Sequence, residues 1–93
     1  MAGVEWTMRS SEVVITWEKG LHARPASRLV RTAQKFASEI RLRFNGNVAN
    51  ARSIMSVLLL CATMGASISV EAEGEDEEKA IQAVQQVFDS MDS

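Results

Sequence analysis

The feature of this sequence that most constrains its fold is a repeated change in the spacing of its apolar residues. Apolar and polar residues alternate at 11–17, 39–44 and 68–73, which is typical of strands that bury one face. Over 23–37, and again from residue 75 to residue 91, apolar residues recur every three or four positions, which predicts helices that each pack one side on a core. Strands and helices therefore alternate, and a purely helical or purely β fold is excluded.

A hairpin and a further helix are predicted between these segments. Asn45 and Gly46 readily adopt the positive φ angles of a two-residue turn, so 47–50 should return antiparallel to the strand before it. The apolar run 54–60 fits strand or helix by its spacing alone. We interpret it as a short helix, because Ser53 is a good residue to begin a helix and methionine and leucine favour helix over strand.

The predicted order of elements is βαββαβα, which indicates an α+β fold. Because the outer faces of the strands are polar, the simplest arrangement is an open-faced β-sandwich, a four-stranded antiparallel sheet with three helices on one face. We expect residues 1–9 to form an N-terminal tail and residues 10–93 to form a single domain.

Composition excludes several classes of protein. The 93 residues, 46% of them hydrophobic, suffice for one small core and not for a multi-domain enzyme. The net charge of −2 gives no overall attraction to nucleic acid, and the longest apolar run, 57–62, is far below the roughly 20 residues that span a membrane. Cys61 is the only cysteine, so no internal disulfide is possible, and with no secretory leader we expect a cytoplasmic protein.

The only histidine, His22, stands just before a predicted helix, where an anion is favoured. The first turn of a helix offers backbone N–H groups without internal partners and the positive end of the helix dipole, which would stabilise a phosphate on the imidazole. The same field favours the neutral, nucleophilic ring. Pro25 stiffens this turn, and Arg24 adds a forked donor for phosphate oxygens. The plainer alternative is a surface or capping histidine.

The heptapeptide around His22, Gly-Leu-His-Ala-Arg-Pro-Ala at 20–26, resembles the active-site motif of the histidine-containing phosphocarrier (HPr) family of the phosphoenolpyruvate-dependent phosphotransferase system. The resemblance continues through 45–46, 51–55 and 70–77, and it covers roughly residues 10–90. It implies a protein that carries phosphate and is not a stand-alone enzyme. It implies no cofactor and no metal ion.

The resemblance also implies roles for single residues. His22 would carry phosphate on Nδ1, received from the phosphohistidine of enzyme I and passed to a histidine of an enzyme IIA domain. Arg24 would be its electrostatic partner, and Ala23 and Pro25 would support the helix start. Ser53 matches the regulatory serine of the family, which adds a serine kinase or phosphorylase to the expected partners; otherwise it is a plain helix cap.

A docking surface is predicted beside this site. Ile54 and Met55 resemble the exposed apolar docking residues of the family. The polar side of the helix predicted at 23–37 is a basic stripe, made of Arg24, Arg28, Arg31 and Lys35, and Arg28 and Arg31 are expected to join Arg24 in docking. An apolar centre with a cationic rim suits a transient partner with acidic edges, although a solvated helix face is the alternative. We expect a monomer.

Other functions compete with this interpretation. The run 58–62 looks closer to the nitrogen-related branch of the family, and Ser56 and Cys61 depart from many sugar-type members. The alternative is therefore a regulatory module that acts through phosphorylation-dependent contacts with its partners. A nucleic-acid binder would need paired aromatic residues on its strands, which are lacking. A metal or thiol enzyme would need ligands that one histidine and one distant cysteine cannot supply.

Overall fold

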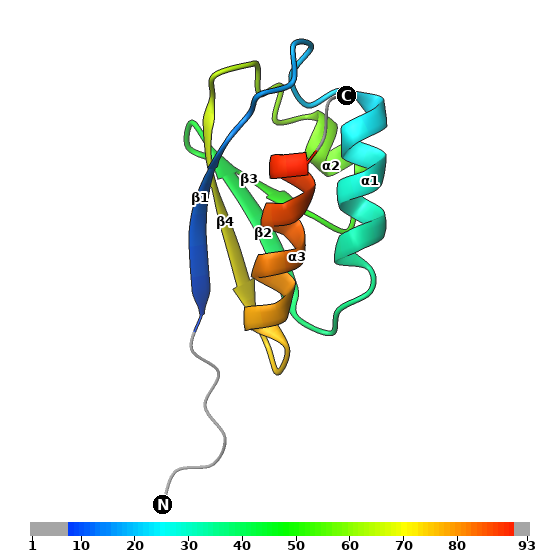
Figure 1. Ribbon diagram of the computed structural model, residues 1–93, viewed down its shortest axis with the longest axis vertical. Coiled ribbons are helices and arrows are strands. Elements are labelled where there is room, and N and C mark those ends of the chain that lie inside the picture. Colours follow the sequence, from blue (N-terminus) through cyan, green and yellow to red (C-terminus); the bar gives the residue numbers. More distant parts are fainter. Residues whose placement is uncertain (1–7, 91–93) are drawn as a thin grey trace, which may run out of the picture.

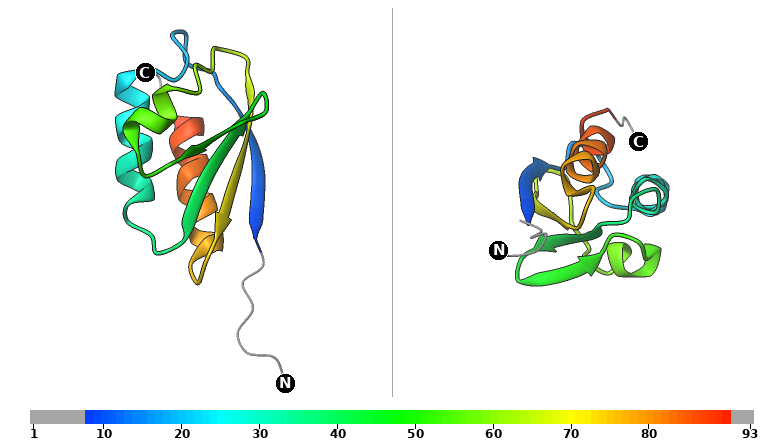
Figure 2. Two further views of the ribbon diagram at one scale, coloured as in Figure 1. Left: turned by 180° about the vertical axis from the view of Figure 1, so that it is seen from behind. Right: turned by 90° about the horizontal axis from the view of Figure 1, so that it is seen from below.

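Residues 8–90, which the computed structural model describes, form four antiparallel strands in the order β1-β4-β2-β3, with three helices on one face (Figures 1 and 2). The elements are β1 (Arg9–Val14), α1 (Ala23–Ala33), β2 (Glu39–Phe44), β3 (Asn47–Asn50), α2 (Ile54–Leu58), β4 (Ser67–Glu73) and α3 (Glu77–Ser90). The predicted order and the open-faced α+β fold are confirmed. Of the predicted tail, 1–7 lie outside the described residues, as does Met91 of the last predicted helix.

One core lies between the sheet and the helices, and it is built from the apolar residues that the spacing predicts. Every second residue of the first predicted strand is buried, namely Val13, Ile15 and Trp17. The ring of Trp17 stacks on Phe88 of α3, with the ring centroids 5.0 Å apart. The predicted hairpin is also confirmed: 45–46 have positive φ angles of 54° and 83°.

Two elements end earlier than their apolar pattern predicts. The first strand is predicted to reach Trp17 but ends at Val14, opposite the first residue of β4. Beyond it, Ile15 bonds to the turn at 65–66, and the Trp17 carbonyl accepts a hydrogen bond from Gly20 N–H in a local turn. The helix predicted at 23–37 ends at Ala33. The N–H groups of residues 35 and 36 donate to carbonyls three residues back, which tightens and ends the helix.

The other two helices are also shorter than predicted. The short helix, predicted at 54–60, ends at Leu58, and Cys61 then takes a positive φ of 53°, which no helix can continue through. The last helix, predicted from Glu75, begins at Glu77. Glu77 and Glu78 occupy its first turn, as the charge pattern predicts, whereas the carboxylate of Asp76 binds the loop before β2.

Asp76 ties the turn before α3 to the loop between α1 and β2. Its carboxylate accepts hydrogen bonds from the backbone N–H groups of Ala37 and Ser38, both at 2.9 Å, and from the Ser38 hydroxyl. The Ser38 hydroxyl, followed by the Ala37 N–H, lowers the pKa of Asp76 below its ordinary value, against the opposing effect of burial. One carboxylate therefore joins two loops that are distant in the sequence.

Acid should destabilise the fold through this contact. Because the pKa of Asp76 is lower in the folded chain, its stabilisation is complete above the unfolded pKa of about 3.9 and is lost as the pH falls through the folded pKa. Asp76→Asn should lower the free energy of unfolding at pH 7 by about 2 kcal/mol and flatten its decline below about pH 4. Urea unfolding between acid and neutral pH measures both, and Glu75→Gln removes an exposed neighbouring charge as the control. An unchanged acid decline in Asp76→Asn would contradict this account.

Ion pairs lie on the face of the sheet that the helices leave uncovered. Glu71 of β4 is buried there, with its two oxygens on Arg43 Nε at 2.7 Å and Arg41 Nε at 3.3 Å. Burial acts to raise the pKa of Glu71, but hydrogen bonds and charge from Arg43 and Arg41 outweigh it, so the net pKa is lowered. Arg41 also contacts Glu39 and Glu73, so charged side chains cross-link β2 and β4.

Candidate functional site

His22 is the N-terminal cap residue of α1. Its backbone is extended, with φ −101° and ψ −171°, and its carbonyl accepts the first hydrogen bond of the helix, from Ala26 N–H at 3.0 Å. The imidazole is half-buried and makes no capping hydrogen bond to the helix. The ring is therefore placed at the positive end of the helix, and His22 caps the helix through its backbone and not through its imidazole.

The first turn of α1 supplies donors at this point. An α-helix leaves the N–H groups of its first turn without partners inside the helix, and because Pro25 has no N–H, the donors here are those of Ala23 and Arg24. Pro25 is buried and Arg24 is exposed. These two N–H groups, the helix dipole and the Arg24 guanidinium can together hold a small anion such as a phosphate.

Gly20 fixes the loop that carries His22. Its φ is +71°, and a Cβ built on it would lie 2.4 Å from the carbonyl oxygen of Ala62 and 2.9 Å from Cα of Thr63. The next residue, Leu21, is buried and donates its N–H to the same carbonyl at 3.0 Å. The sequence indicates only that Gly20 ends a strand, because the close contact with a segment 42 residues away is a tertiary feature.

Gly20→Ala should therefore destabilise the fold much more than a usual glycine substitution does. The positive φ and the contact with backbone atoms that cannot move aside should together lower the free energy of unfolding by about 2–4 kcal/mol. Gly46→Ala is the matched control, because Gly46 also has a positive φ but has no atom near its added Cβ, so about 1 kcal/mol is expected. Urea unfolding of both variants makes the comparison. Equal losses would show that the contact with Ala62 is unimportant.

Ser53 begins α2 as the sequence predicts. It has extended backbone angles, and its Oγ accepts a hydrogen bond from Ser56 N–H at 3.3 Å. The Ser56 hydroxyl in turn accepts from Asn50 N–H at 2.9 Å, which joins the start of α2 to the end of β3. Ser53 is half-buried. A further contact comes from the Arg52 guanidinium, which donates to the Phe36 carbonyl and links this turn to the chain after α1.

An exposed apolar patch follows Ser53. Ile54, Met55 and Leu59, which we call the α2 patch, have exposed fractions of 37%, 62% and 72%. Sequence reasoning identified the first two and missed Leu59, which lies four positions after Met55 and so falls on the same side of the helix. Both views of the ribbon place α2 beside the half of α1 that begins at His22 (Figures 1 and 2).

The basic stripe predicted on the helix at 23–37 is exposed along its whole length. Arg24, Arg28 and Arg31 lie on α1, and Lys35 follows the end of the helix. The Arg31 guanidinium is 3.5 Å from Ser27 Oγ, and Arg28 and Lys35 also line a groove between α1 and α3. The structure therefore brings His22, Ala23, Arg24 and Pro25 together at one helix start, with the α2 patch beside them, and places Arg28 at the border of the groove.

Other kinds of site are not found in the described part of the chain. Among residues 8–90, no three histidine, cysteine, aspartate or glutamate side chains are placed to hold a metal ion. Over the same residues, no helix is both long and apolar enough to cross a membrane.

Comparison with known proteins agrees with this geometry. The sequence model of the family described as PTS HPr component phosphorylation site matches residues 9–90. This chain belongs to the HPr family. The phosphocarrier protein HPr of Xylella fastidiosa (strain 9a5c) is 43% identical over 83 residues, which are 89% of this chain and 93% of that protein. Carrying phosphate is thus the general role of the family to which the chain belongs.

Solved HPr structures have the same fold. A crystal structure described as HPr-C-His of Thermoanaerobacter tengcongensis superimposes with a TM-score of 0.85 and 39% identity, and it covers 88% of this chain and 92% of that one. A crystal structure described as the HPr dimer of the same organism matches with a TM-score of 0.72 and 38% identity, and it covers 97% of this chain and 95% of that one. The resemblance to HPr predicted from 20–26 is confirmed.

Proposed function

We propose that this HPr-family protein accepts a phosphoryl group from enzyme I on His22 and passes it to a histidine of an enzyme IIA domain. The observation that carries the proposal is the position of His22, whose imidazole stands at the N-terminus of α1 and does not cap the helix. The neutral ring nitrogen attacks the phosphorus of the phosphohistidine of enzyme I, so that one P–N bond forms as another breaks. The reverse exchange on enzyme IIA regenerates the free His22.

The residues around His22 stabilise the group in transit. Phosphoryl transfer between nitrogen atoms needs positioning and charge stabilisation more than covalent assistance from the protein. Arg24 places a permanent positive charge and a forked donor beside the phosphate, and the N–H groups of Ala23 and Arg24 face the same end of the helix. Pro25, buried in the first turn, keeps the helix start rigid.

Partner proteins dock on the surface beside His22. The α2 patch supplies apolar contact area, and Arg24 and Arg31 supply a cationic rim for acidic residues of enzyme I and enzyme IIA. Arg28 adds charge at the border of this surface, next to the groove between α1 and α3. Such a small surface suits brief encounters, and the protein works as a monomer.

Ser53 regulates docking when it is phosphorylated by a serine kinase and is reset by a phosphorylase. Its hydroxyl already accepts a hydrogen bond at the start of α2, and it precedes Ile54 and Met55 of the α2 patch. A phosphate there adds close to two negative charges next to the docking surface. A second candidate function is therefore a regulatory module, favoured by the half-exposed position of Ser53 at the edge of this patch.

A reconstituted relay separates the two functions. The chain is added in small amount to phosphoenolpyruvate, enzyme I and an excess of an enzyme IIA domain, and phosphorylated enzyme IIA is followed with time. A carrier yields many phosphorylated enzyme IIA molecules for each copy of the chain. If the chain becomes phosphorylated while enzyme IIA stays unmodified with every IIA tested, the carrier function is wrong and the regulatory module remains.

A further inference from the structure

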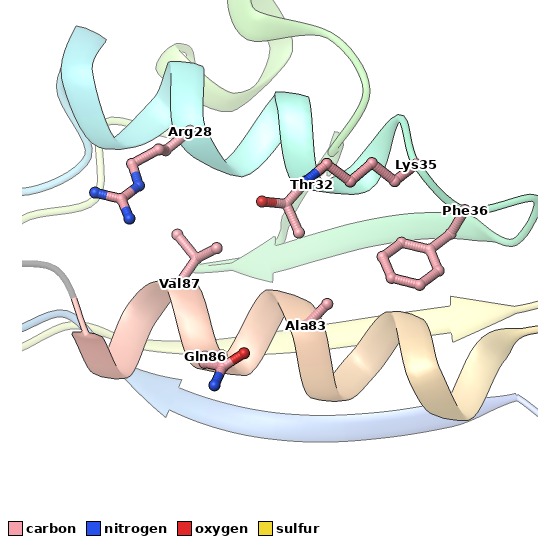
Figure 3. Close-up of a pocket in the computed structure, with 7 residues that line it drawn as sticks. All are labelled: Arg28, Thr32, Lys35, Phe36, Ala83, Gln86 and Val87. Carbon is pink, nitrogen blue, oxygen red and sulfur yellow. The ribbon is translucent and has the colours of Figure 1, made fainter.

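A groove of about 430 Å³ lies between α1 and α3, away from the α2 patch. Its α1 side is lined by Arg28, Thr32, Lys35 and Phe36. Figure 3 shows Arg28 and Thr32 directed into the space between the helices, with the ring of Phe36 at one end. Nothing in the phosphoryl relay uses Lys35, Thr32 or Phe36, and Arg28 is the one groove residue with a role in the proposed function, at the border of the docking surface.

The α3 side of the groove is mostly apolar. Val87 points from α3 toward α1, and Ala83 lies one turn before it (Figure 3). Gln86 also lines the groove, but its amide lies on the side of α3 that faces away from α1 (Figure 3). The groove thus has an apolar floor of three side chains, counting Phe36, and polar groups around it.

The charge of the lining is entirely positive. The residues that line the groove include one arginine and one lysine but no aspartate or glutamate, although the chain as a whole has a net charge of −2. Arg28 and Lys35 are seven positions apart on the same side of the chain, and the Thr32 hydroxyl lies between them. A forked guanidinium, an ammonium group and a hydroxyl are together a donor set that fits a phosphate group better than a single carboxylate.

We propose that this groove binds a small organic phosphate, a phosphate monoester of a flat aromatic or heterocyclic group. Arg28, Lys35 and Thr32 hold the phosphate. The flat group lies on Phe36, Ala83 and Val87. The size of the groove is within the usual range of small-molecule sites. The site is distinct from His22, so its occupancy does not require transfer chemistry.

The test is a titration of the ¹⁵N-labelled chain with adenosine 5′-monophosphate, followed by amide chemical shifts. Saturable chemical-shift changes are expected in residues 28–36 and 83–87. Adenosine lacks the phosphate and inorganic phosphate lacks the flat group, so each should bind at least tenfold more weakly than the monophosphate. Lys35→Gln should weaken binding of the monophosphate by about tenfold. Lys79→Gln, which removes an exposed lysine of α3 outside the groove, should change it less than about twofold.

Three results would overturn the proposal. One is the absence of shifts up to about 10 mM monophosphate. Another is an equal effect of Lys35→Gln and Lys79→Gln, which would indicate general attraction of an anion to a charged surface. The third is a set of shifts centred on 22–24 and unaffected by Lys35→Gln, which would place the ligand at the helix start. The amide spectrum of each variant alone shows whether it is folded, so a misfolded variant is recognised and replaced by Lys35→Met.

Discussion

Replacing His22 by alanine is expected to abolish phosphorylation of the chain by enzyme I and phosphoenolpyruvate. The sequence contains no other histidine, so no second ring nitrogen can accept the group. In the parent chain the phosphoryl group should be lost in acid and kept in base. This behaviour is typical of a phosphoryl group on an imidazole nitrogen and differs from that of one on serine. Because His22 caps α1 only through its backbone, His22→Ala should fold normally, which its circular dichroism spectrum and melting temperature check. Full labelling of that variant would disprove the central proposal.

Arg24→Ala is the comparison variant for this experiment. It removes a charged donor to phosphate but keeps the acceptor ring, so transfer should slow and not stop. A charged hydrogen bond contributes about 1.5–3 kcal/mol, which corresponds to a rate lower by roughly 10- to 150-fold. An unchanged rate would mean that the helix N-terminus alone stabilises the phosphate, while complete loss would make Arg24 as necessary as the nucleophile.

Ser53→Asp is expected to lower the rate of His22 phosphorylation about tenfold at low salt, by weakening the association with enzyme I. The added carboxylate lies at the start of α2 next to Ile54 and Met55, where it repels an acidic partner. Aspartate is a good N-cap, so the melting temperature should change little. Most of the loss should disappear above about 0.5 M salt, because exposed charges are then screened within a few ångströms.

Ser53→Asn is the matched control. Asparagine has the shape of aspartate and also caps helices well, but it carries no charge, so its transfer rate should stay within about twofold of the parent. A direct binding titration with enzyme I distinguishes weaker association from slower chemistry. If Ser53→Asp binds enzyme I as tightly as Ser53→Asn at low salt, Ser53 is only a helix cap and the regulatory proposal should be abandoned.

Local sequence determined the elements of this fold and their order. The alternation at 11–17 predicts that Val13, Ile15 and Trp17 are buried, because side chains of an extended chain point to opposite faces whatever the partner strand is. The turn at 45–46 and the cap at Ser53 are also local, since each depends on the preferences of one or two residues. His22 was found in the same way, from a motif that contains its own helix start.

Only the tertiary structure decided where these elements end and which distant residues they contact. β1 ends at Val14, opposite the residue at which its partner strand begins, and the Asp76 carboxylate binds the loop at 37–38 while its carbonyl accepts the Ala80 N–H of α3. Gly20 is required because a side chain there would meet the Ala62 carbonyl, and the groove that Arg28 lines exists only because α3 packs beside α1. Each of these contacts joins residues distant in the chain, and neither periodicity nor residue preference carries information about which distant backbone or side chain will be adjacent.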